Sequence, residues 1–167
     1  MKNQFLLCFM IFFVKDLYSF EIDKELVGWW KSDHKLTYDF NSAVVKKEYF
    51  ADVEKMWGNL YILYKKNGTV EIFLKGKNEI TKVDETNYSV VLISRVSLIL
   101  IFGQPDSITE NYRRIRFVDN KTYWIYLSSG GMDFHLREYF IKISEPEFYK
   151  EYIKTNGTTS EIKKNTR

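Results

Sequence analysis

The amino-acid sequence predicts an all-β protein: an up-and-down antiparallel β-barrel followed by one C-terminal α-helix. Short runs of alternating apolar and polar residues recur along the chain, as expected of strands with one buried face. Turn residues separate these runs at short intervals, without the long crossovers that parallel strands need. Aromatic residues make up 17% of the chain and prolines number only two, a composition that favours strands. Closing such a sheet into a barrel removes its exposed edges.

The N-terminus has the features of a secretory signal peptide. Lys2 supplies a positive charge, residues 5–14 form an apolar run, and Leu17 and Ser19 stand at the −3 and −1 positions of a cut after residue 19. A run of ten residues is too short to cross a bilayer as a helix, because a spanning helix needs about 20. We therefore expect a secreted or periplasmic protein; an uncleaved anchor or a buried first element is the alternative.

The rest of the chain has room for one domain. We assign residues 1–19 to the signal peptide, 20–156 to a single barrel domain with its helix, and 157–167 to a polar tail. The only cysteine, Cys8, lies inside the apolar run and not at the cleavage point, so we expect neither a lipid anchor nor a disulfide. A net charge of +3 is near balance and indicates no nucleic-acid partner. We expect a monomer.

Turn residues typical of hairpins separate the first predicted strands. Asn67-Gly68 is the strongest of them, because both residues accept positive φ. Residues 85–87 are expected to form a second turn. The run 88–102 is the most apolar stretch after the N-terminus, and it predicts one long bent strand or two short ones. The predicted strands of this half are residues 59–64, 69–75, 79–84 and 88–102.

The second half predicts further strands and then a helix. The strands are residues 109–119, 121–129 and 133–143. Ser144 and Glu147 have the spacing of a capping box, and Pro146 is tolerated in a first helical turn. The helix is therefore predicted over residues 145–155, ended by Asn156-Gly157.

Gly28-Trp29-Trp30, in "LVGWW", resembles the G-x-W motif that opens the first strand of lipocalins and other small secreted calycin-type barrels. The resemblance implies that Gly28 allows a close backbone approach, that Trp30 closes the barrel floor, and that Arg137 packs its guanidinium against Trp30. The second lipocalin motif, T-D-Y, is absent, and no disulfide can form. A related small β-barrel or β-sandwich is the alternative.

The resemblance also implies an internal ligand site. If Trp124 and Tyr126 face inward from residues 121–129, together with Thr122, they would line it. His135 and Tyr139, on the same strand face as Arg137, would complete it. Tyr123, Ile125 and Leu127 would then face outward. The abundant aromatic residues could instead fill a dry core.

Catalytic and metal-binding patterns are weak. The sequence has no nucleophile elbow, P-loop or dinucleotide fingerprint, and Ser128-Ser129-Gly130-Gly131 is typical of a hairpin loop. Asp133 and His135 share a strand face, but a metal site needs at least three converging ligands. We expect no enzyme activity, metal or cofactor.

The basic run "YRRIR" splits its charges between two faces. Arg114 and Arg116 fall on one side of a strand and Arg113 on the other, which makes a poor track for phosphates. We expect these arginines to lie on a solvated outer face or to place a cation at the barrel mouth. Such a cation could bind an anionic ligand head group.

The sequence thus favours an exported binding protein for a small apolar or amphipathic molecule. The alternative is an exported β-domain that acts through its outer surface, with a filled core. Residues 88–102 are then the expected contact region, because they are the most apolar. No integral membrane segment is expected after signal cleavage.

Overall fold

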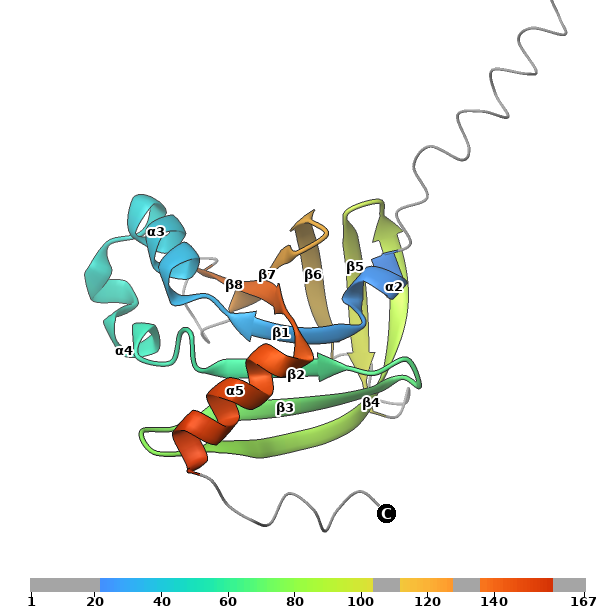
Figure 1. Cartoon of the computed structure of the whole chain (residues 1–167). Helices are drawn as coiled ribbons and strands as arrows, with labels where there is room; N and C mark the ends of the chain where they lie inside the picture. Colours follow the sequence, from blue (N-terminus) through green and yellow to red (C-terminus); the bar gives the residue numbers. More distant parts are fainter. Residues whose placement is uncertain (1–21, 104–111, 128–135, 158–167) are drawn as a thin grey trace, which may run out of the picture.

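The computed structural model describes residues 22–103, 112–127 and 136–157, which form a closed barrel of eight antiparallel strands (Figure 1). The strands are β1 (Gly28–Ser32), β2 (Leu60–Tyr64), β3 (Thr69–Lys75), β4 (Ile80–Ser94), β5 (Ser97–Phe102), β6 (Tyr112–Asp119), β7 (Thr122–Leu127) and β8 (Leu136–Ile143). They follow one another around the barrel in chain order, and β8 pairs with β1. The predicted up-and-down barrel is confirmed.

Helices occupy both ends and one side of the barrel. They are α2 (Ile22–Leu26), α3 (His34–Val44), the short 3₁₀ turn η1 (Lys47–Tyr49), α4 (Ala51–Glu54) and α5 (Glu145–Asn156). Three of them, α3, η1 and α4, fill the connection between β1 and β2, for which the sequence analysis predicted no helix. Asp33 begins α3 as its N-cap, accepting a hydrogen bond of 2.9 Å from the backbone N–H of Leu36.

The strand β4 differs from its prediction. A turn was expected at residues 85–87, but the strand runs unbroken from Ile80 to Ser94. Its first half pairs with β3 and its second half with β5. Asn87 pairs with Thr69, and the Tyr88 N–H donates to the Gly68 oxygen, so these backbone groups are satisfied by a ladder and not by a turn.

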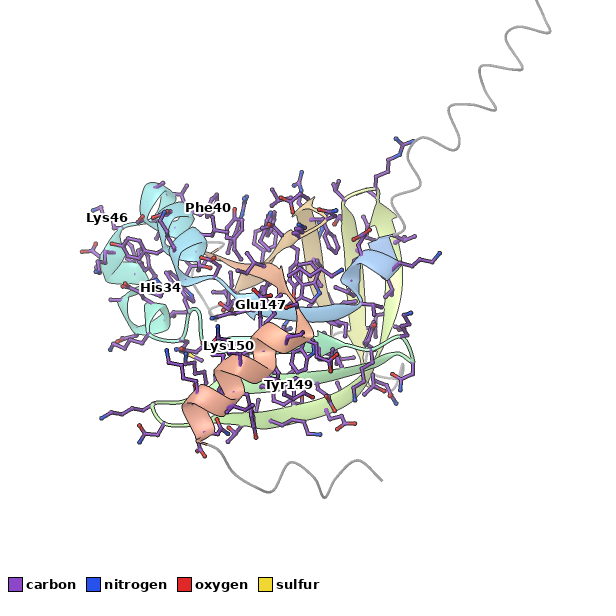
Figure 2. The ribbon with its side chains drawn as sticks, viewed as in Figure 1. His34, Phe40, Lys46, Glu147, Tyr149 and Lys150 are labelled. Carbon is purple, nitrogen blue, oxygen red and sulfur yellow. The ribbon has the colours of Figure 1, made fainter. Side chains whose placement is uncertain are left out.

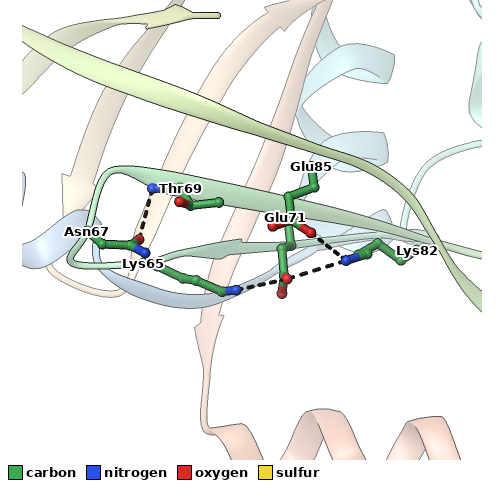
Figure 3. A network of polar contacts seen from close by, with 6 residues as sticks. All are labelled: Lys65, Asn67, Thr69, Glu71, Lys82 and Glu85. Carbon is green, nitrogen blue, oxygen red and sulfur yellow. Dashed lines mark hydrogen bonds and ion pairs between the residues drawn. The ribbon is translucent and has the colours of Figure 1, made fainter. Parts of the chain in front are cut away.

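The β2–β3 turn follows its sequence signal. Asn67 Oδ1 accepts a hydrogen bond of 3.1 Å from the Thr69 N–H, and Gly68 has φ +79°. Behind the turn, Glu71 lies between two lysines: its carboxylate is 2.8 Å from Lys65 Nζ and 3.5 Å from Lys82 Nζ (Figure 3). These contacts join the β2–β3 turn, β3 and β4.

Trp30 closes one end of the barrel. It is fully buried, and its indole N–H donates to the Leu26 carbonyl oxygen of α2 at 2.7 Å. The rings of Phe117 and Tyr123 pack against it, with centroids 6.0 and 4.6 Å away. Trp30 is therefore part of the buried core at this end of the barrel, where the resemblance led us to expect it. We call this the closed end, and the opposite one, where α3 and α4 lie, the open end.

The helix α5 packs on the outer face of the barrel, across β1, β2 and β3 (Figure 1). Phe148 stacks on Trp29 with ring centroids 3.8 Å apart. Burial opposes ionisation of Glu151, but hydrogen bonds from Lys75 (2.6 Å) and Lys31 (2.9 Å) lower its pKa to about 2. The predicted capping box is present, so both the start and the buried face of α5 are fixed.

Candidate ligand-binding site in the barrel lumen

The barrel encloses a cavity of about 420 Å³. Strands β2 to β7 line it with alternate residues, as the two-residue period of strands requires. The apolar part of the lining is Leu60, Ile62, Val70, Ile72, Phe102, Ile115 and Ile125. The polar part is Tyr64, Asp84, Thr86, Arg113 and Tyr123. A mostly apolar cavity with a few polar groups is what small-molecule sites have in common.

The lining changes character along the barrel. On β6, Phe117 packs under Trp30 at the closed end, Ile115 follows, and Arg113 is exposed nearer the open end. The alternation also puts Tyr123 on β7 nearer the closed end than Ile125. The lumen is therefore aromatic at its floor, aliphatic in the middle and charged toward its mouth.

Arg113 is a cation on the inner strand face. It pairs across the sheet with Leu100, a buried core residue, and so shares the inward parity of Ile115. Arg114 and Arg116 have the opposite parity, and Arg114 Nε donates to Ser97 Oγ at 3.2 Å. The predicted division of these arginines between two faces is confirmed. Asp84 lines the same cavity, so its mouth carries both signs of charge.

The predicted inward face of β7 is wrong. Tyr123 and Ile125 face the lumen, whereas Trp124 and Tyr126 lie on the outer face. The register fixes this, because Tyr123 pairs with the buried Phe140 of β8 and their rings stack at 5.0 Å. Aromatic residues occupy both faces of β7, so hydrophobic alternation alone did not identify the inner one.

The face chosen on β8 was also wrong. Arg137 and Tyr139 point outward, where α3 covers them. The Arg137 guanidinium lies between the ring of Phe40, which projects from α3 (Figure 2), at 4.2 Å and that of Trp124 at 4.1 Å. This stack attaches α3 to the barrel wall. His135, Asp133 and the Ser128–Gly131 loop lie outside the described residues.

Lys142 has the position that was assigned to Arg137. It pairs across the sheet with Trp30, and its Nζ lies 5.3 Å from the centre of the indole ring. The Nζ also donates to the Glu25 carbonyl oxygen at 2.5 Å. Burial lowers the pKa of Lys142, and Glu25 opposes that shift.

Gly28 is distinguished by its backbone conformation. A Cβ at Gly28 would meet the Lys142 side chain at 3.4 Å, and its φ of +125° disfavours any other residue. A distance of 3.4 Å to a side-chain carbon is an ordinary van der Waals contact, so the positive φ, and not the close backbone approach that the resemblance implied, favours glycine here.

A carboxyl group is buried in the wall near the open end. Glu138 is 7% exposed and accepts a hydrogen bond of 2.5 Å from Ser32, whose oxygen accepts another from the Gly58 N–H at 2.9 Å. Burial raises the pKa of Glu138, and the Ser32 hydrogen bond opposes the shift. Sequence analysis missed this residue, because an isolated Glu in a strand carries no pattern.

The described segments contain no group of three or more His, Cys, Asp or Glu side chains placed to hold a metal ion. Within the same segments, no helix has the length and apolar character to span a membrane.

The fold and its cavity define a class, the small closed antiparallel barrels with an internal chamber, and the architecture is consistent with the calycin-like fold. In comparisons with known proteins, no family model matches the sequence, and no curated protein matches it at a significant level.

Proposed function

We propose that this protein is an exported, lipocalin-like carrier that holds one small apolar or amphipathic molecule in the barrel lumen, and that it acts by binding and not by catalysis. The cavity of about 420 Å³ carries the proposal. Ligand sites typically measure about 300–1,000 Å³, and an eight-stranded barrel is just wide enough to hold one small ligand. The N-terminal signal features support export.

The distribution of aromatic residues supports a hollow barrel over a filled one. Trp29 and Phe148 pack between the barrel and α5, and Trp124 packs under α3. These large rings therefore lie on the outer face of the barrel and not in its lumen. In the middle of the lumen the side chains are isoleucines, among them Ile62, Ile72 and Ile115. These aliphatic groups leave a space that larger rings would have filled.

A cavity-filling variant tests the proposal. The neutral dye N-phenyl-1-naphthylamine fluoresces in apolar surroundings and reports saturable binding. We expect it to bind the wild-type protein with one site per chain. Ile72→Phe puts a ring into the lumen and should weaken binding by tenfold or more, because an overfilled site excludes the dye.

The matched control is Val83→Phe, which adds the same ring to an exposed position of β4. It should leave binding unchanged. Non-saturating dye fluorescence in the wild type, or equal binding by Ile72→Phe and the wild type, would refute a lumenal site.

A second candidate function rests on the tip of the β4–β5 hairpin. Four neighbouring apolar residues are exposed there: Val91, Leu92, Ile93 and Val96. This is the region expected from the sequence to act as a contact surface. It favours association with another protein surface, a second copy of the chain being the partner to test first.

A further inference from the structure

The floor of the cavity holds two hydroxyl groups in an otherwise apolar setting. Tyr64 and Tyr123 line the cavity from β2 and β7, and both are almost completely buried. The hydroxyl of Tyr123 has no hydrogen-bond partner among the residues that the structure describes. A buried polar group without a partner is uncommon and costs free energy.

The two tyrosines cannot satisfy each other completely. The Tyr123 hydroxyl has no partner in hydrogen-bond geometry, but the two hydroxyls are close enough that hydrogen bonding between them contributes to the pKa of each. Suppose that a small rotation let one hydroxyl donate to the other. Two hydroxyls carry two hydrogens, and only one would be used. One O–H therefore remains to donate to a group inside the lumen.

The surroundings of this donor favour an uncharged partner. Burial raises the pKa of both tyrosines, so they are neutral donors at physiological pH. Glu138 adds to the rise in the pKa of Tyr123, which places negative charge and not positive charge nearby. A carboxylate desolvated against these groups would lack a compensating cation.

The cations of the barrel lie elsewhere. Arg113 is exposed toward the mouth of the cavity. Lys142 does not line the cavity, and its Nζ is held by the Glu25 carbonyl oxygen. Neither is placed to neutralise an anion at the tyrosine pair.

We propose that the lumen takes an uncharged apolar molecule with a hydrogen-bond acceptor, such as a ketone or ester carbonyl, at its inner end. The acceptor binds the Tyr64–Tyr123 pair, and the apolar body lies against Ile62, Ile72 and Ile115. This inference rests on the proposed carrier function and narrows its ligand class.

Three probes of matched length test the inference: octan-2-one, octane and octanoate. Each competes with N-phenyl-1-naphthylamine for the wild-type protein at pH 7. We expect octan-2-one to displace the dye at a concentration about five- to tenfold lower than octane, since one hydrogen bond is gained. Octanoate should be the weakest competitor, because its charge is desolvated.

Tyrosine variants identify the donor. The double variant Tyr64→Phe/Tyr123→Phe should abolish the advantage of octan-2-one and leave the affinity for octane unchanged. Tyr126→Phe, on the outer face of the same strand as Tyr123, is the matched control and should change nothing. Each of the three substitutions removes a single oxygen atom, and thermal unfolding will show that the variants are folded.

The outcomes separate the two proposals. If the dye and octane bind and Ile72→Phe excludes them, but octan-2-one has no advantage over octane, the carrier function stands and the tyrosine inference is wrong. Preference for octanoate would also overturn it, in favour of an anion anchored by Arg113. The tyrosine inference would also be wrong if the double variant still bound octan-2-one more tightly than octane. If no probe binds, both proposals fail.

Discussion

At the residue scale, Glu138 is the clearest case of a group whose ionisation opposes folding. Its carboxyl is buried in the barrel wall with Ser32 as its hydrogen-bond donor. Because burial raises its pKa in the folded protein above the ordinary value of 4.5, ionisation favours the unfolded chain. Its cost is absent below about pH 4.5, where both states are protonated, and grows as the pH rises through the folded pKa.

Glu138→Gln should therefore stabilise the protein at pH 7. The amide keeps an oxygen that accepts from Ser32 but carries no charge, and we expect the free energy of unfolding to rise by on the order of 1 kcal/mol. Urea unfolding at several pH values measures this difference, which should shrink toward pH 4. The exposed Glu79→Gln is the control, expected to have no effect at any of these pH values. A lower stability of Glu138→Gln at pH 7 would contradict the assignment.

Single residues also show where sequence reasoning stops. The positions of Gly28 and Trp30 at the start of the first strand could be predicted, because a short motif marks them. The inward face of β7 could not, since Tyr123, Trp124 and Tyr126 are all aromatic and both faces of the strand are covered. Only the register with β8, which pairs Tyr123 with Phe140, decides which ring enters the lumen.

At the element scale, Phe148 is the buried residue of α5 that packs on the barrel. Phe148 stacks on Trp29 and also contacts Phe73 and Tyr61, with centroids 5.2 and 5.5 Å away. We expect Phe148→Ala to lower the free energy of unfolding by about 3 kcal/mol, the usual cost of emptying a buried aromatic site.

The control for this helix is Lys150→Ala, an exposed residue labelled on α5 in Figure 2. It should change the free energy of unfolding by less than about 0.5 kcal/mol. Denaturant unfolding of both variants measures the difference. Equal, small effects would mean that α5 contributes little to the stability of the barrel.

Elements were predictable where their signals are local. The capping box of α5 and the Asn67-Gly68 turn depend on residues within a few positions of each other, and both are confirmed. The length of β4 depends on pairing with β3 and then β5, which are distant partners for its two halves. Residues 85–87 have turn-like composition, yet the ladder with β3 keeps them extended.

At the scale of the whole molecule, closure of the barrel followed from the hairpin order, but the cavity did not. Whether a barrel is hollow depends on which residues of each strand face inward and on how far helices cover its outer face. Here α3 and α5 bury rings that would otherwise have been assigned to the core. The sequence therefore could not decide between a hollow and a filled barrel. The volume of the cavity between the isoleucines favours the hollow barrel.

We expected a monomer from the sequence, but closure of the barrel does not pair the whole length of β4. On its β3 side, the strand pairs only as far as Asn87, and the described residues provide no strand partner there for residues 89–94. That stretch includes the exposed Val91, Leu92 and Ile93. An unpaired apolar edge is a template for pairing with another chain.

We therefore expect weak self-association through this edge, seen as a concentration-dependent sedimentation coefficient. Leu92→Lys should make the protein monomeric at every concentration, because a charge on an edge strand opposes pairing, while dye binding in the lumen stays unchanged. Lys77→Leu, on the β3–β4 turn at the open end, is the control for a change of surface hydropathy elsewhere. A wild-type protein that is monomeric up to high concentration would show that this edge is covered or inert, and loss of dye binding in Leu92→Lys would link the tip to the lumen.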